Sequence, residues 1–137
     1  MNNLFSIIIP TFNRIDQLKL CLKSINNIHV TDFSYEIIVI DDSSTDSTTV
    51  YLSEIKENNF TFLRNRSKGP SAARNMGAQK ASGKYLVFLD DDCTVPSDWL
   101  IKYNNLLKTF TDCVIGGSVL DATGHPISRV MEFVTLF

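Results

Sequence analysis

The chain has 137 residues, of which 44% are apolar and 20% charged, and it carries a net charge of −2. This length fits one ordinary domain, and the composition excludes a disordered, collagenous or coiled-coil chain. The near-neutral charge leaves no bulk positive field for non-specific binding of nucleic acid or anionic lipid.

The three cysteines, Cys21, Cys93 and Cys113, are odd in number and far apart in the sequence. Their spacing matches neither a disulfide framework nor a zinc site. A reduced, cytoplasmic setting is therefore expected. No apolar run approaches the roughly 20 residues that a membrane-spanning helix requires.

The first half of the chain alternates short apolar runs with segments whose apolar residues recur at helical spacing. Pro10 closes the first run, and Asn13 suits a helix N-cap. In chain order, the sequence predicts a strand at Leu4–Ile9, a helix from Asn13 to about residue 26, a strand at Tyr35–Ile40, a helix carrying Leu52 and Ile55, and a strand at Phe60–Leu63.

The second half continues this alternation. An alanine-rich stretch that ends before Gly83 indicates a helix, and Pro96-Ser97 suits the start of another. The predicted order is a helix at Pro70–Ala81, a strand at Tyr85–Leu89, a helix opened by Pro96-Ser97, a strand at Cys113–Leu120 and a turn at 122–125.

The predicted strands are apolar throughout instead of alternating, so both faces of their sheet are expected to be covered. We therefore predict an α/β fold with a mostly parallel central sheet and helices on both faces. Ligands of such sheets bind beyond the carboxyl ends of the strands. The residues that follow positions 9, 40 and 89 are thus the candidates for function.

Polar residues at the first two strand ends each have two readings. Those after the first strand could line a pocket for a flat polar ligand or form a capped turn. After the second strand, Asp41 or Asp42 could accept a hydrogen bond from an imide N–H such as that of uracil, or could belong to an Asx turn. The residues after the first strand are Pro10, Thr11, Phe12, Asn13 and Arg14.

The strongest signal is Asp90-Asp91-Asp92, directly after the YLVFL strand; we call these three residues the acid run. Three successive carboxylates repel one another, so they require a cation or several donors unless they form a solvated acidic turn. Hard oxygen ligands suit Mg²⁺ or Mn²⁺, which take one or two carboxylates together with water and substrate phosphates. Counter-charge for a diphosphate could come from Arg66, Lys68 or Arg74.

Three motifs stand in one order at the predicted strand ends: SIIIPTFNR, EIIVIDDSSTDST and GPSAARNMGAQKASGKYLVFLDDDC. Over roughly residues 4–120 the chain resembles the amino-terminal half of family 2 glycosyltransferases, which have the Rossmann-like GT-A fold. The resemblance implies binding of a nucleoside diphosphate sugar, usually a UDP-sugar. It also implies metal-dependent, inverting transfer of the sugar to an acceptor hydroxyl.

The resemblance further implies roles for individual residues. Asp42 would contact the base, the acid run would be the DXD motif, and Asp92 would bind Mn²⁺ or Mg²⁺. The remaining members of the implied nucleotide-sugar site are Pro10, Thr11, Phe12, Asn13, Asp41, Arg74, Asn75, Asp90 and Asp91.

The general base of the family usually lies in its acceptor half, and we assign none here. Asp98 reads as a first-turn helix residue, and no motif surrounds the later acidic residues Asp112, Asp121 and Glu132. We expect residues 1–137 to form a single nucleotide-sugar-binding domain that ends before the acceptor-binding half.

The expected partners are a nucleoside diphosphate sugar and a carbohydrate or glycoconjugate acceptor, without nucleic acid. The resemblance leaves room for peripheral association with the inner membrane face through a region beyond this chain, and the apolar end favours self-association. The alternative function is a non-catalytic module that binds a nucleotide or nucleotide sugar.

Overall fold

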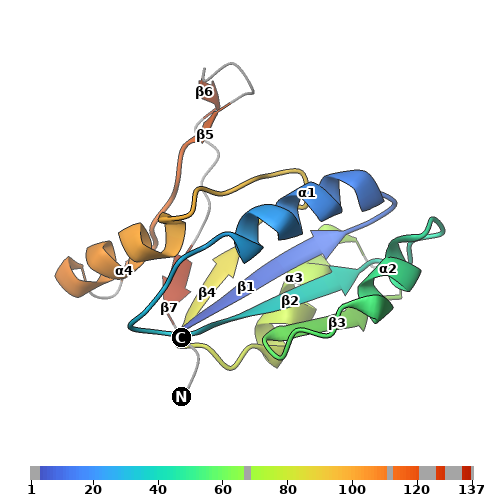
Figure 1. The fold of residues 1–137 in the computed structure, drawn as a ribbon, viewed down its shortest axis with the longest axis horizontal. Coiled ribbons are helices and arrows are strands. Elements are labelled where there is room, and N and C mark those ends of the chain that lie inside the picture. Colours follow the sequence, from blue (N-terminus) through green and yellow to red (C-terminus); the bar gives the residue numbers. More distant parts are fainter. Residues whose placement is uncertain (1–3, 67–68, 111–112, 121–125, 129–133, 137) are drawn as a thin grey trace.

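A computed structural model describes residues 4–66, 69–110, 113–120, 126–128 and 134–136. Its central sheet has the strand order β3-β2-β1-β4-β7 (Figure 1). The first four strands in the chain are parallel, and β7 joins β4 in the antiparallel direction. These strands are β1 (Phe5–Thr11), β2 (Tyr35–Asp41), β3 (Phe60–Arg64), β4 (Tyr85–Phe88) and β7 (Val134–Leu136).

Four helices connect and cover these strands: α1 (Ile15–Asn26), α2 (Thr48–Glu54), α3 (Pro70–Lys80) and α4 (Trp99–Thr109). Side chains of α1, α2 and α4 share one apolar cluster with β1 and β2. On the other face, Ala73 of α3 packs against Ile38 and Ile40 of β2. Figure 1 shows the same arrangement, with α3 behind the sheet and α1 and α2 in front. The predicted α/β fold with both faces covered is confirmed.

Helix α1 forms as its sequence pattern predicts, since Leu18, Cys21, Leu22 and Ile25 are buried at helical spacing. The predicted N-cap is wrong. Arg14 occupies that position, while Asn13 has a left-handed φ of 52°. A tertiary contact replaces the local cap, as described with the site below.

Gly83 was expected to close α3, but that helix ends at Lys80 and is capped at Ala81. Gly83 is needed for close packing instead. A Cβ there would lie 2.6 Å from Ser6 Oγ and 2.7 Å from the carbonyl carbon of Phe5. The loop before β4 can reach β1 only because this residue has no side chain.

Helix α4 begins at Trp99, later than the predicted opening at Pro96-Ser97. The Ser97 carbonyl accepts a hydrogen bond from the backbone N–H of His29 at 3.1 Å, outside the helix. The first carbonyl used within α4 is that of Asp98, which accepts from the N–H of Lys102 at 3.0 Å. A long-range contact therefore sets where this helix starts.

The predicted strand at Cys113–Leu120 is mostly wrong. Only β5 (Val119–Leu120) is a strand there, and it pairs antiparallel with β6 (Pro126–Ser128) in a separate two-stranded sheet. On the side away from β1, the neighbour of β4 in the central sheet is β7. The turn predicted at 122–125 lies outside the described residues.

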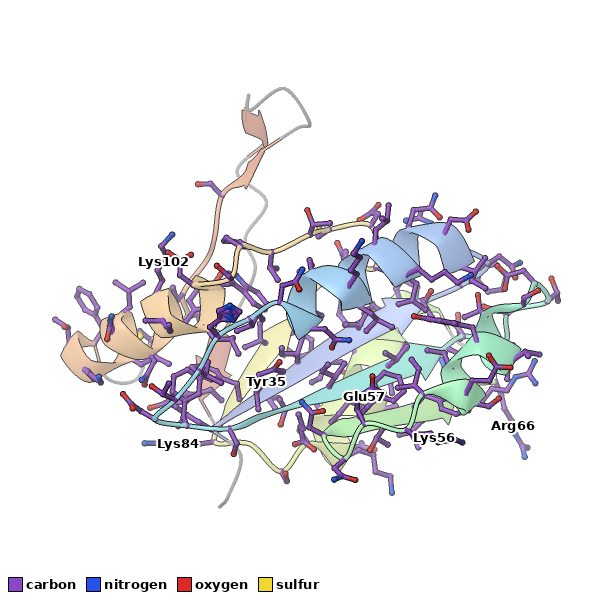
Figure 2. All side chains as sticks on the ribbon, viewed as in Figure 1. Tyr35, Lys56, Glu57, Arg66, Lys84 and Lys102 are labelled. Carbon is purple, nitrogen blue, oxygen red and sulfur yellow. The ribbon has the colours of Figure 1, made fainter. Side chains whose placement is uncertain are left out.

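Charged side chains such as Lys56, Arg66 and Lys102 are exposed and extend away from the ribbon (Figure 2). Within the described ranges, no helix combines the length and apolarity needed to cross a bilayer.

Candidate functional site

The carboxyl ends of β1, β2 and β4 meet at one edge of the sheet because these strands are parallel neighbours. Thr11 pairs in register with Asp41, and the N–H of Asp42 donates to the Thr11 carbonyl at 2.9 Å. The N–H of Leu89 donates to the Ile8 carbonyl at 3.0 Å and brings the acid run to the same edge. A cleft of about 330 Å³ opens there. Its lining residues are Pro10, Thr11, Phe12, Arg14, Asp42, Pro70, Arg74, Asp90, Asp91 and Asp92.

Asp91 is the buried member of the acid run, with 5% of its surface exposed. Its Oδ2 accepts a hydrogen bond of 2.7 Å from the Thr11 hydroxyl, and its Oδ1 lies 3.4 Å from Arg14 Nη1. Burial raises the pKa of the Asp91 carboxyl above its ordinary value, against the opposing effect of Thr11 and Arg14. The neighbouring Asp92 charge adds to the rise.

The two outer members of the acid run are exposed to the cleft and bound by arginines. Arg14 Nη1 lies 3.0 Å from Asp92 Oδ2, and Arg74 Nη2 lies 2.7 Å from Asp90 Oδ1. The side chains of Asp90 and Asp92 are each 50% exposed. The guanidinium groups of Arg14 and Arg74 thus pair with the three carboxylates and reduce the repulsion among them.

Asp42 is held in the cleft wall by the start of α3. Its Oδ1 accepts from Asn65 Nδ2 at 2.7 Å, and its Oδ2 accepts from the N–H of Gly69 at 3.0 Å. Gly69 caps α3 with a φ of 83°, a conformation that side chains disfavour, and Pro70 follows as the first helical residue. With these contacts in place, Asp42 remains one of the residues that line the cleft.

Asp41, the other acidic residue at this strand end, is fully buried and does not line the cleft. Its Oδ1 accepts from the N–H of Ser44 at 2.9 Å, and its Oδ2 accepts from the hydroxyl of Thr49 at 2.7 Å. These bonds tie the turn after β2 to α2. The geometry gives Asp41 a structural role rather than the ligand contact that the resemblance implied.

Two asparagines of the implied site also lie outside the cleft lining. Asn13 Oδ1 accepts from the N–H groups of Thr45 and Asp46, at 2.7 and 3.3 Å. It therefore joins two strand-end loops, since its left-handed backbone turns the side chain toward the loop after β2. Asn75 is an exposed residue of α3.

The structure adds Arg14 to the implied residues. It is the last residue of the SIIIPTFNR motif, and its ion pairs connect positions 77 and 78 residues apart in the sequence. A cation between a strand end and a helix start is a sequence signal for a site residue. The sequence does not show that its partners are Asp91 and Asp92, because that contact depends on the fold. Among the other proposed cations, Arg66 is exposed and Lys68 lies outside the described residues.

A divalent ion is compatible with the donor set of the cleft. Among the residues that the structure describes, no three His, Cys, Asp or Glu side chains form a preformed metal cage. Mg²⁺ and Mn²⁺ do not require one, because they combine one or two carboxylates with water and substrate phosphates. The half-exposed carboxylate of Asp92 meets that requirement.

The acidic residues considered as a general base are not part of the cleft as far as the structure describes them. Asp98 forms an ion pair with Lys102 at 2.9 Å at the start of α4. Asp112, Asp121 and Glu132 lie outside the described residues.

Comparison with known proteins gives the family. The family model described as Glycosyl transferase family 2 matches residues 6–125. The chain is 34% identical over 130 residues to a poly(ribitol-phosphate) beta-glucosyltransferase of Bacillus spizizenii. This alignment covers 92% of the chain but only 20% of that protein.

Solved structures show the same fold. TarS 1-349 of S. aureus in complex with UDP-GlcNAc matches with a TM-score of 0.78 and 25% identity, over 91% of this chain and 37% of that one. A mannosyltransferase from Pyrobaculum calidifontis, in complex with GDP-Man and Mn²⁺, matches with a TM-score of 0.71 and 23% identity, over 88% of this chain and 36% of that one. The predicted GT-A fold and the family resemblance are both confirmed, and the chain belongs to glycosyl transferase family 2.

Proposed function

We propose that this chain is the donor-binding part of an inverting, metal-dependent glycosyltransferase that uses a UDP-sugar and an acceptor hydroxyl. The observation that carries the proposal is the shared cleft in which Asp42 and the acid run stand at neighbouring strand ends. Asp42, after β2, offers a hydrogen-bond acceptor for the nucleotide base. The acid run, after β4, offers carboxylates for a metal-bound diphosphate.

The base would bind at the Asp42 side of the cleft. Asn65 and Gly69 hold the Asp42 carboxylate in place, so it could accept the imide N–H of uracil without reorganising. The ring of Phe12, which is 53% exposed, lines the same cleft and could stack on the base. TarS, which binds UDP-GlcNAc, supports uridine as the base.

The diphosphate would bind at the acid run, with Asp92 as metal ligand. A divalent ion bound there would neutralise the charge that develops on the departing diphosphate. Asp91 would keep its position in the cleft lining, because it is buried and accepts a hydrogen bond from Thr11. Arg74, on α3, lies close enough to Asp90 to supply further positive charge to the phosphates.

For the acceptor and the general base we propose a chemical type, without naming a particular acceptor molecule or residue. Transfer with inversion needs a group that takes the proton from the acceptor hydroxyl as it attacks the anomeric carbon. We assign no described residue to that role. The Bacillus relative, named for poly(ribitol-phosphate), favours a glycoconjugate acceptor. Peripheral membrane association and self-association remain predictions from the sequence.

Calorimetric titration with UDP, GDP and ADP, each with and without MnCl₂, tests the donor site. We expect UDP to bind best and Mn²⁺ to strengthen its binding. Asp92→Ala should remove the strengthening by Mn²⁺, and Asp42→Ala should weaken UDP binding in both conditions. Asp98→Ala is the control, because Asp98 is an exposed acid that does not line the cleft.

The proposal fails if both cleft variants bind like the wild-type protein. Release of UDP from UDP-GlcNAc or UDP-glucose then separates an enzyme from a binding module. Slow release by water would support glycosyl transfer. Tight donor binding with no release, even with added acceptor, would favour the non-catalytic module.

A further inference from the structure

Arg14 is placed where one nitrogen contacts two carboxylates of the acid run. Its Nη1 lies 3.0 Å from Asp92 Oδ2 and 3.4 Å from Asp91 Oδ1. Arg14 itself is the N-cap residue of α1, so its backbone is anchored while its side chain remains 52% exposed. A long side chain in water can leave such a contact without disturbing the fold.

The two carboxylates that Arg14 contacts are held very differently. The side chain of Asp91 is 6% exposed and is fixed by the Thr11 hydroxyl at 2.7 Å. The side chain of Asp92 is 50% exposed, and it contacts Arg14 at 3.0 Å and the thiol of Cys93 at 3.8 Å. Arg14 is thus the principal partner of the carboxylate proposed to bind the metal.

A divalent ion bound by Asp92 would compete with the Arg14 guanidinium for the same carboxylate. An ion of the Mg²⁺ class binds a carboxylate oxygen at about 2.1 Å, and two cations on one carboxylate repel each other. Arg14 must leave Asp92 when the metal binds there. The oxygens of a diphosphate are strong alternative partners for a guanidinium.

We propose that Arg14 is a displaceable counter-ion, which covers Asp92 in the free protein and moves to the diphosphate when donor and metal bind together. This inference rests on the proposed function. It makes nucleotide and metal binding mutually reinforcing, because the nucleotide removes the competitor of the metal. The metal alone should bind weakly, since it must displace Arg14 with no new partner for the guanidinium.

Electron paramagnetic resonance of free Mn²⁺ measures metal binding directly, without turnover. The protein is titrated with MnCl₂ alone and then with saturating UDP. Arg14→Gln keeps much of the side-chain length and removes the charge, whereas Arg14→Lys keeps a cation. Lys102→Ala is the matched control, since it also removes a cation from a carboxylate pair, but on α4 (Figure 2).

We expect Arg14→Gln to bind Mn²⁺ alone about three- to tenfold more tightly than the wild-type protein, a range suited to an exposed charge pair facing a divalent ion. UDP should then raise its Mn²⁺ affinity by a smaller factor than in the wild type. Arg14→Lys and Lys102→Ala should both resemble the wild type. Rescue by lysine would separate the charge of Arg14 from a purely structural role.

Equal or weaker binding of Mn²⁺ alone by Arg14→Gln would overturn the inference. So would an undiminished effect of UDP in this variant. If the wild-type protein instead binds neither UDP nor Mn²⁺ in the presence of UDP, the proposed function itself is wrong. The two failures are therefore distinguishable within one set of titrations.

Discussion

Carboxylates lie at both edges of the central sheet, where the strands begin (the amino edge) and where they end (the carboxyl edge). They differ in exposure and in the number of hydrogen-bond donors that hold them. At the amino edge, one oxygen of Glu36 accepts hydrogen bonds from the hydroxyl of Ser6, from the N–H and hydroxyl of Ser82, and from the N–H of Gly83. Their lengths run from 2.6 to 3.2 Å. All of these donors come from the domain itself.

At the carboxyl edge, Asp90 and Asp92 are half exposed and are held by single arginines across an open cleft. Exchange of such exposed partners costs little, whereas loss of the Glu36 donors would leave a partly buried charge unsatisfied. The comparison separates a carboxylate whose hydrogen bonds hold the fold together from carboxylates that are accessible from the cleft. The four predictions below test that distinction.

The largest effect is expected at Gly83, beside the Glu36 cluster. In Gly83→Ala the new Cβ would meet backbone atoms of Phe5 and Ser6 at 2.7 and 2.8 Å, and these cannot rotate away. We expect a loss of about 3 kcal/mol in the free energy of unfolding, measured by urea denaturation. Lys84→Ala, at the exposed next residue, should be nearly neutral. A loss below about 1 kcal/mol would mean that the amino edge tolerates rearrangement.

Thr11→Val should have the next largest effect, because it removes the hydroxyl that satisfies the buried Asp91 carboxylate. The expected loss of stability is about 2 kcal/mol. Thr11→Ser keeps the donor and should recover most of this loss in the same urea experiment. A negligible loss in Thr11→Val would contradict the role of this hydrogen bond, because that variant keeps the methyl group and removes only the hydroxyl.

Glu36→Gln should cost about 1 kcal/mol near neutral pH, after allowance for the partial exposure of Glu36. Burial raises the pKa of Glu36, but its hydrogen bonds from Ser6, Ser82 and Gly83 outweigh this and hold the pKa below the ordinary 4.5. The charged form therefore stabilises the fold above pH 4.5, and this contribution disappears as the pH falls through the lowered pKa. Urea denaturation of the wild-type protein and Glu36→Gln across roughly pH 3–7 checks the sign of this pH dependence. The range extends about one unit or more on either side of the ordinary glutamate pKa of 4.5. A difference that grows on acidification would contradict it.

Arg74→Ala should have the smallest effect on stability, at most about 0.5 kcal/mol, because its 2.7 Å pair with Asp90 is exposed on both sides. Thermal denaturation in low and high salt would measure it. A loss comparable to that of Gly83→Ala would place Arg74 among the structural contacts and remove the contrast between the two edges.

Much of the fold follows from local patterns. The apolar runs of β1, β2 and β4 and the helical spacing in α1 predicted these elements and their parallel order, since a strand apolar on both faces has to be covered on both. The placement of Thr11, Asp42 and the acid run at one edge followed from the same rule.

The errors arose where a distant partner competed with a local preference. Asn13 suits a helix cap, yet its side chain accepts from the loop after β2. The start of α4 is set by the bond from His29 to Ser97. Beyond Cys113, apolar residues predicted a strand of the central sheet, but short apolar runs do not identify their partner. Here β5 pairs with β6 instead.

The amino-acid sequence by itself determined the order of strands and helices from β1 to α4, the family and the chemistry of the residues at the strand ends, because these depend on local periodicity and residue type. The residue types alone did not distinguish Asp41 from Asp42; the family resemblance favoured Asp42, and the tertiary structure supplies the physical difference. Successive side chains at a strand end point in opposite directions, so Asp41 is buried in the turn and Asp42 lines the cleft. Only the tertiary structure, likewise, brought Arg14 to Asp92 across 78 positions of the chain, since a contact between distant residues is decided by the packing of the elements that carry them.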